Sequence, residues 1–210
     1  MVEKLGFIEE KSCRIAGYKR IAGVDEAGRG PLAGPVVAAA LILPEKFKAS
    51  WVDKIADSKY VTETRREFLF QKLNSAAEGI GVGVIDAMTI DMVGIAKACR
   101  LAMKAAVKQL DPPPDYLLID FFKLPEVKLP QKGVIEGDTL CFSIACASII
   151  AKVTRDHLML EFDKKYPGYG FAEHKGYGTR MHLDNLKRLG PSPIHRTSFQ
   201  PVRDVISVPA

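Results

Sequence analysis

The chain has 210 residues, of which 47% are hydrophobic and 26% are charged. This balance is typical of a globular protein with one domain and an extension, and it excludes a disordered or fibrous chain. The longest run without a charged residue (30–44) has 15 residues and three prolines, short of the roughly 20 apolar residues of a membrane-spanning helix. Because the N-terminus lacks the basic and then apolar pattern of a secretory signal, we expect a cytoplasmic protein that does not enter a membrane.

The net charge of +5 is concentrated near the C-terminus. Residues 164–203 contain eight Lys or Arg and only two Asp or Glu, together with three of the four histidines. Such a segment indicates a surface for a polyanion, although an ordinary solvated face has the same composition. The four cysteines have neither the spacing of zinc ligands nor that of a disulfide framework, so we expect buried, reduced thiols. They are Cys13, Cys99, Cys141 and Cys146.

Short apolar runs, partly β-branched and mostly bounded by Gly or Pro, predict four strands. They are 20–25, 35–43, 79–85 and 116–120. The second run follows the first after a short segment rich in Gly and Pro, which favours a hairpin.

Periodic patterns between and after these runs predict helices. Apolar residues recur on one face through 95–110, and 140–151 is uncharged before charged residues follow, as in a helix buried at its start. Thr64 and Glu67 have the spacing of a capping box, which places a helix start near Thr64. A short helix is expected at 181–189, followed by an irregular tail. The alternation of strands and helices predicts an α/β fold whose sheet is covered on both faces.

Four carboxylates lie at the boundaries of predicted strands and helices. Asp25 and Glu26 end the first strand, Asp120 ends the fourth, and Asp138 precedes the helix that starts near residue 140. Neighbours in a strand point to opposite faces, so Asp25 and Glu26 can share a site only if the chain bends, for which 27–31 is suited. A divalent cation would offset their repulsion, and all-oxygen ligands favour magnesium or manganese. The alternatives are that Asp138 is a helix N-cap and that Asp120 is a turn residue.

The first predicted strand leads into a glycine-rich loop. Gly28, Gly30 and Gly34 superficially match a dinucleotide fingerprint, but proline and a second strand follow where that motif requires a helix. The Walker pattern is also absent. The loop can bring its backbone amides close to a sugar-phosphate, with Arg29 binding a phosphate, or it can be a plain hairpin turn.

Four segments together resemble the ribonuclease HII family. They are 25–36 (DEAGRGPLAGPV), 57–59 (DSK), 143–156 (SIACASIIAKVTRD) and 174–179 (HKGYGT). The resemblance spans about residues 20–200 and implies a ribonuclease H-like mixed sheet flanked by helices, with a helical C-terminal extension. It divides the chain into an N-terminal segment (1–19), a catalytic core (20–165) and a basic extension that contributes to substrate binding (166–210).

The resemblance also implies a metal-dependent endoribonuclease that uses Mg²⁺ or Mn²⁺. Its substrates would be the RNA strand of RNA–DNA hybrids and duplex DNA cut 5′ to embedded ribonucleotides, with two-metal catalysis leaving 5′-phosphate and 3′-hydroxyl ends. Such an enzyme removes ribonucleotides and RNA primers. The expected partners are these nucleic acids and no membrane. We expect a monomer, and 199–210 contains no convincing sliding-clamp peptide.

The family's catalytic and metal-binding acids fall on the four carboxylates already grouped: Asp25, Glu26, Asp120 and Asp138. The family's Gly-Arg-Gly loop, which senses the ribose 2′-hydroxyl and its phosphates, falls on Gly28, Arg29 and Gly30. Its sugar-sensing tyrosine falls on Tyr177, for which simple loop packing is the alternative. Further substrate contacts are implied at Lys59, Ser148 and Lys152. Duplex affinity would come from these cations and the basic segment through counterion release.

The chain departs from many relatives in a few places. Phe121 and Phe122 follow Asp120 where a small residue is common, which puts the local packing in doubt, and Cys141 and Cys146 replace Ser or Ala. Two other classes of protein remain as alternatives. A non-catalytic nucleic-acid-binding module would explain the basic segment but not the four acids, and a nucleotide-dependent enzyme would explain the glycines alone.

Overall fold

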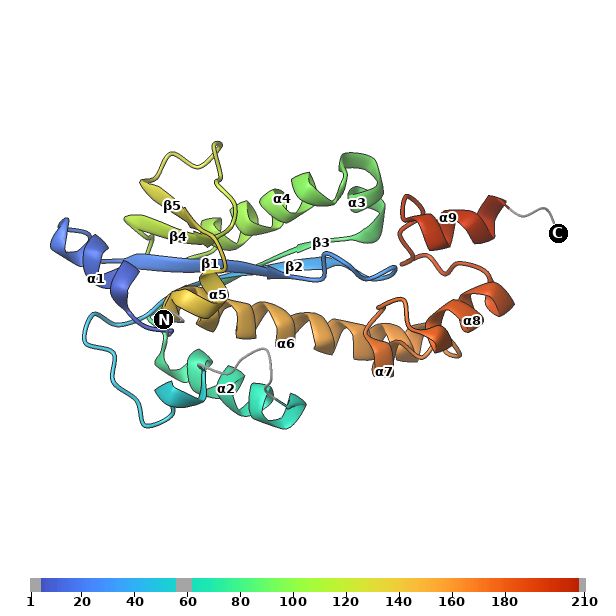
Figure 1. The fold of residues 1–210 in the computed structure, drawn as a ribbon, viewed down its shortest axis with the longest axis horizontal. Coiled ribbons are helices and arrows are strands. Elements are labelled where there is room, and N and C mark those ends of the chain that lie inside the picture. The colour runs from blue at the N-terminus through green and yellow to red at the C-terminus, as the bar shows by residue number, and fades with distance from the viewer. Residues whose placement is uncertain (1–4, 56–61, 208–210) are drawn as a thin grey trace.

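The computed structural model describes residues 5–55 and 62–207, and it contains one five-stranded sheet (Figure 1). The strands are β1 (Ile21–Ala27), β2 (Val36–Ile42), β3 (Gly79–Ile85), β4 (Tyr116–Asp120) and β5 (Gln131–Val134). Their order across the sheet is β3-β2-β1-β4-β5; the first three are antiparallel neighbours, whereas β4 runs parallel to β1 and β5 parallel to β4. The four strands predicted from the sequence and the mixed α/β sheet are thereby confirmed.

The fifth strand was not predicted. β5 reads Gln-Lys-Gly-Val and buries only Val134, so it lacks the apolar run that marks a strand. Its conformation comes from pairing with β4, in which Leu117 lies beside Gln131 and Asp120 beside Val134. The Gln131 side chain also bonds to the backbone of the preceding loop, including the amide of Leu124 at 2.7 Å.

Helices cover both faces of the sheet, as predicted (Figure 1). On one face α6 (Phe142–Lys165) and α2 (Glu63–Ala76) pack on the sheet through one apolar cluster. On the other face α4 (Ile95–Lys108), which follows α3 (Ala87–Val93), packs through a second. β2 lies between the two layers and buries all seven of its residues, which explains its continuous apolar sequence.

α2 begins at Glu63, so the helix start expected near Thr64 is confirmed, but the capping residue differs. Its N-cap is Thr62, whose hydroxyl accepts a hydrogen bond from the Arg65 amide at 3.4 Å. Thr64 is already inside the helix, so the capping box with Glu67 is wrong. The two threonines stand two residues apart, and the extended backbone of Thr62 (ψ 156°) decides which of them caps.

The remaining helical elements are short. The short elements are α1 (Ile8–Ile15), the 3-10 turn η1 (Val52–Lys54), α5 (Gly137–Leu140), α7 (Phe171–His174), α8 (Arg180–Leu189) and α9 (Gln200–Ser207). The helix expected at 181–189 is confirmed, but the expected irregular tail is wrong, because α9 follows it. α9 is amphipathic and buries Val202 against Leu32 and Leu186. In the described part of the chain we find no helix long and apolar enough to cross a bilayer.

The N-terminal helix is joined to the start of α6. Glu10 of α1 is buried, and its Oε1 accepts hydrogen bonds from the Ser143 amide at 2.7 Å and the Cys141 thiol at 3.2 Å. A carboxylate at this place satisfies a free amide of the first turn of α6 and interacts favourably with the helix dipole. All four cysteines are free and buried, as predicted.

Gly23 of β1 sets how closely α6 approaches the sheet. A Cβ on Gly23 would lie 2.2 Å from the backbone carbon of Ser143, so no other residue fits without separating strand and helix. We predict that Gly23→Ala lowers the free energy of unfolding by about 1–3 kcal/mol, the usual cost of overpacking a core. Urea unfolding of this variant beside Val84→Ala, a substitution on the half-exposed side of β3, is the measurement; equal midpoints for Gly23→Ala and wild type would contradict it.

Candidate active site

Two of the predicted acids meet at the carboxyl ends of adjacent strands. β1 and β4 are parallel and pair Val24 with Ile119, so Asp25 and Asp120 are the next residues on neighbouring strands. Asp25 is 5% exposed, whereas Asp120 is partly exposed. Asp120 Oδ1 accepts a hydrogen bond from the Gly137 amide at 2.7 Å, which connects the end of β4 to α5.

Glu26 follows Asp25 in β1, and the bend expected at 27–31 comes after it. β1 pairs regularly with β2 through Ala27, and the chain turns only at Gly28, whose φ is +96°. The Glu26 side chain is 4% exposed and makes an ion pair with Arg29 at 3.4 Å. Its backbone amide donates a hydrogen bond to Asp25 Oδ1 at 2.7 Å.

The charges of these three carboxylates act on one another. Burial raises the pKa of Asp25 well above its ordinary value, the charges of Glu26 and Asp120 raise it further, and a hydrogen bond from Ser148 opposes them. The pKa of Glu26 is raised to about 7, chiefly by burial; Arg29 lowers it and Asp120 raises it. In the free protein, like charges and loss of solvent therefore both disfavour the ionised state of the site.

Asp138 lies in α5 and lines one cleft with Glu26. It caps neither helix, because the N-cap residue of α5 is Glu136 and that of α6 is Cys141, so the helix-capping alternative is wrong. The cleft has a volume of about 370 Å³. The predicted substrate residues that also line it are Gly28, Arg29, Gly30, Ser148, Lys152 and Tyr177. Lys59, the remaining one, lies outside the described residues.

Arg66 of α2 also lines the cleft, and sequence reasoning missed it. It is one of 30 Lys and Arg residues, and no local pattern distinguishes it. Only the packing of α2 beside α6 brings it to the site.

The donor set fits a divalent cation. Glu26 Oε2 is buried and has no hydrogen-bond partner in the described part of the chain, so a coordinating ion would satisfy it. A cation would also offset the repulsion that raises the pKa values of Asp25 and Glu26. Among the described residues no three Asp, Glu, His or Cys side chains are arranged to hold an ion by themselves. Magnesium does not require three, because it commonly takes one or two carboxylates and completes its shell with water and phosphate oxygens.

The glycine-rich loop is a hairpin connection between β1 and β2 rather than a loop leading into a helix, which contradicts the nucleotide-fingerprint alternative. Two buried arginines hold it. Arg196 donates hydrogen bonds to the carbonyls of Gly28 at 2.6 Å, Arg29 at 3.0 Å and Gly34 at 2.9 Å. Arg196 belongs to the basic segment but is fully buried, so it contributes to no surface for a polyanion.

The second arginine ties this hairpin loop to the segment that carries Tyr177. Arg155 of α6 donates hydrogen bonds to the carbonyls of Ala33 at 3.0 Å, Pro35 at 2.9 Å and Lys175 at 2.9 Å. Tyr177 is 43% exposed, and its ring lies beside Gly30 and 5.7 Å from the Lys152 ammonium. Gly30 and Tyr177 thus face the same cleft from segments far apart in the sequence.

A chain of hydrogen bonds between buried histidines fixes the backbone at Tyr177. The Ser192 amide donates to His195 Nδ1 at 2.9 Å, so the proton of His195 is on Nε2. That N–H donates to His182 Nε2 at 3.0 Å, and His182 Nδ1–H donates to the Tyr177 carbonyl at 2.9 Å. Each ring accepts one hydrogen bond and donates one, which requires both to be neutral. His174 stacks on His182 at 4.2 Å.

Known proteins similar to this chain agree in sequence and in fold. A family model described as Ribonuclease HII matches residues 22–202. The ribonuclease HII of Dehalococcoides mccartyi is 55% identical over 203 residues, which cover 97% of this chain and 96% of that protein. The ribonuclease HII of Desulfitobacterium hafniense is 56% identical over 200 residues, 95% of this chain and 76% of that one. The crystal structure of ribonuclease H2 from Pyrococcus horikoshii superposes with a TM-score of 0.74 and 26% identity, covering 89% of this chain and 96% of that chain.

The histidine chain predicts a loss of stability in acid. Burial lowers the pKa of His182 and of His195 from 6.5 to about 4. Between these pH values the unfolded state binds more protons than the folded state, so stability is full above pH 6.5 and falls as the pH drops toward 4.

The measurement is the urea midpoint between pH 7 and pH 4.5. We expect His182→Asn, which removes one titrating ring, to flatten the pH dependence. An unchanged pH dependence in His182→Asn would contradict the neutral histidine chain.

Proposed function

This chain belongs to the ribonuclease HII family, and from that membership we propose that it hydrolyses the RNA strand of RNA–DNA hybrids as an endonuclease. We extend the proposal to incision of duplex DNA on the 5′ side of an embedded ribonucleotide. The observation that carries it is the joint position of mutually interacting carboxylates and a hairpin loop that meets Tyr177, all at one end of the sheet. The cellular roles would be the removal of ribonucleotides and of RNA primers.

Four carboxylates supply the metal ligands in this proposal. Asp25, Glu26 and Asp120 would hold Mg²⁺ or Mn²⁺, and Asp138 would complete the shell or position a water molecule. Two ions held by these residues would supply a water of lowered pKa and stabilisation of charge on the 3′-oxygen, and the products would carry 5′-phosphate and 3′-hydroxyl ends. The protein contributes by holding these side chains before any ion arrives, through the Gly137 amide on Asp120 and the Glu26 amide and Ser148 on Asp25.

Substrate choice is proposed to depend on the sugar. The 2′-hydroxyl distinguishes RNA from DNA at a single residue. Gly28 and Gly30 carry no Cβ, so their amides can approach that hydroxyl, and Arg29 is exposed enough to bind a phosphate. Tyr177 would pack its ring on the next sugar and disfavour one with an extra hydroxyl.

The remaining substrate contacts come from cations around the cleft. Lys152 lines the cleft and is paired with Asp156 at 2.7 Å, so it contacts a phosphate while that carboxylate keeps it in place. Ser148 acts through its hydrogen bond to Asp25 as well as by lining the cleft. The exposed basic residues of the extension (166–210) would bind the duplex beyond the core (20–165) through counterion release.

The metal assignment predicts that Asp120→Asn folds but does not cut. The neutral amide removes a ligand charge, and we expect turnover on a hybrid to fall by more than the roughly 10- to 100-fold that substitution of an outer-shell partner costs. The measurement is cleavage of a labelled hybrid with Mg²⁺, with Mn²⁺ and with chelator. The control is Asp111→Asn, a substitution of an exposed residue that precedes the first residue of β4. Cleavage by Asp120→Asn at the wild-type rate would refute the assignment.

The sugar-sensing role predicts a selective effect of Tyr177→Ala. Incision at a single ribonucleotide in DNA should fall much more than cleavage of a continuous hybrid, because only the first substrate has a deoxyribose next to the cut. Tyr177→Phe keeps the ring and should retain the wild-type ratio of the two rates. If Tyr177→Ala changes neither rate relative to the other, the residue only packs the loop.

A further inference from the structure

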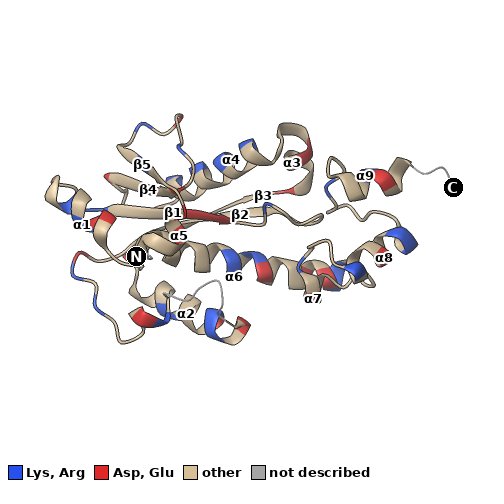
Figure 2. Cartoon of the chain, in the orientation of Figure 1, with Lys and Arg blue, Asp and Glu red and all other residues tan. Residues whose placement is uncertain are grey.

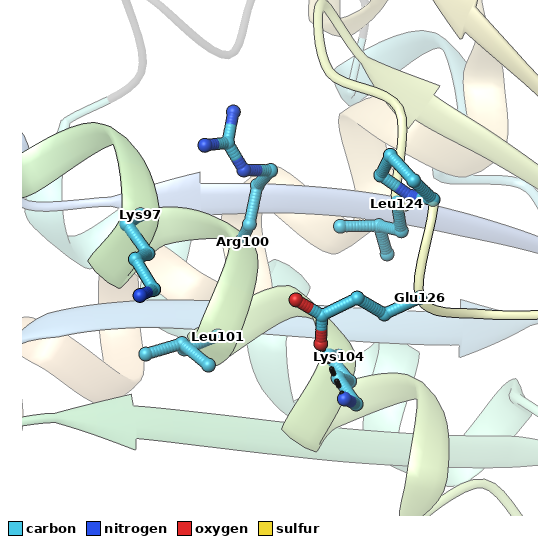
Figure 3. A pocket seen from close by; sticks show the side chains of 7 residues that line it. Lys97, Arg100, Leu101, Lys104, Leu124 and Glu126 are labelled. Carbon is cyan, nitrogen blue, oxygen red and sulfur yellow. Dashed lines mark hydrogen bonds and ion pairs between the residues drawn. The ribbon is translucent and has the colours of Figure 1, made fainter.

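A second concave site lies on the opposite face of the sheet from α6, between α4 and the loop that follows β4. Figure 3 shows it from close by, with side chains of the helix facing those of the loop. Its volume is about 390 Å³. Residues from both segments line it, and we call it the α4 groove: Lys97, Arg100, Leu101, Lys104, Leu124, Pro125 and Glu126.

Three cations and one carboxylate surround the α4 groove. Lys97 and Arg100 are exposed, and neither makes a hydrogen bond or ion pair with any residue that the structure describes. Lys104 binds Glu126 at 2.5 Å. Lys104, Lys97 and Arg100 all lower the pKa of Glu126, which shows that one carboxylate stands in the field of all three cations. The groove therefore attracts anions, and the Glu126 carboxylate already occupies part of it.

The α4 groove is next to the candidate active site. The loop that forms one of its walls starts immediately after Asp120, and Phe122 in that loop lies under the Arg29 guanidinium at 5.1 Å. Phe122 also packs in one apolar cluster with Cys99 and Met103 of α4, so this loop joins the helix to the residues around Arg29. Figure 2 shows basic residues along α4, above the strands that carry the acids.

The geometry suits the backbone of a nucleic acid. Lys97, Arg100 and Lys104 recur at i, i+3 and i+7 on α4, at intervals of about 4.5 and 6 Å along the helix axis. Such spacing allows cations to meet successive phosphates of one strand. Leu101 and Pro125 give the groove an apolar lining, with Leu124 buried in the core behind it, and such a lining suits the carbon face of a sugar better than a small hydrated anion.

We propose that the α4 groove binds the sugar-phosphate backbone of the duplex beyond the active-site cleft, and that Glu126 occupies the phosphate position until the duplex arrives. The proposal rests on the function proposed above and extends its substrate interface to the face of the core that α4 covers. Lys97 and Arg100 neutralise phosphates, and Lys104 exchanges Glu126 for one. Binding there releases counterions and adds to the salt dependence of affinity.

The test measures binding of a fluorescent RNA–DNA hybrid in chelator, across a series of salt concentrations. For Lys97→Gln/Arg100→Gln we expect Kd to rise several-fold and the slope of log K against log salt to fall by about two, because each phosphate contact contributes about one. The control is Lys19→Gln/Lys46→Gln, which removes the same charge from exposed residues before β1 and after β2, at the end of these strands away from Asp25. Its slope should equal that of wild type.

A second variant is expected to change the affinity for the hybrid in the opposite direction. Glu126→Gln removes the internal anion and its repulsion of phosphate, so the hybrid should bind more tightly than to wild type. Because Glu126 is exposed, this change leaves the fold intact. General loss of stability cannot produce tighter binding, which separates the proposal from a merely structural effect.

The outcomes separate this inference from the proposed function. If wild type cuts the hybrid with Mg²⁺ but Lys97→Gln/Arg100→Gln keeps the wild-type slope, the α4 groove is overturned alone. If Glu126→Gln binds no more tightly, its role as a stand-in for phosphate is overturned. A third outcome is that wild type binds the hybrid but does not cut it, while the double variant shows the expected lower slope. In that case the proposed function fails and the α4 groove stands.

Discussion

The structure depends on bringing carboxylates together where they repel one another. Asp25 and Glu26 are nearly inaccessible to solvent, and the charge of Asp120 acts on both. Such an arrangement disfavours folding unless protons or cations neutralise it. The surrounding architecture sets it up nonetheless: parallel pairing of β1 with β4 places two acids side by side, and the Gly137 amide holds one of them. In the proposed function, a divalent cation would offset this concentration of negative charge.

A second constraint comes from two buried, positively charged side chains. Arg155 and Arg196 are fully buried, and the carbonyls of the hairpin loop satisfy their guanidinium groups. Arg155 also binds the Lys175 carbonyl, while His182 binds the Tyr177 carbonyl from the other side. Buried donors thus fix the backbone of both loops that border the cleft. The exposed side chains of Arg29 and Tyr177 therefore project from a backbone that buried side chains hold.

Positive charge on the protein surface does not follow the basic C-terminal segment alone. Arg196, counted there by sequence, is internal, whereas the cations of α4 lie outside that segment and face solvent. Net charge along the chain is therefore a poor guide to the electrostatic surface. What determines the surface is which helix face points outward, and α4 turns its apolar stripe to the sheet and its cations to the groove.

By itself the sequence determined four strands, the helical face of 95–110 and, through its motifs, the family, whereas the grouping of all four acids into one metal site stays a prediction. These features depend on residues close together in the chain, where alternation, periodicity and turn chemistry act directly. Tertiary structure alone decided that β5 is a strand, that Thr62 rather than Thr64 caps α2, and that the tail forms α9 over Leu32. It also decided that Arg66 reaches the cleft and that Arg196 leaves the surface. The reason is physical: pairing with a neighbouring strand, competition between adjacent caps and burial by distant segments depend on partners that no local pattern names.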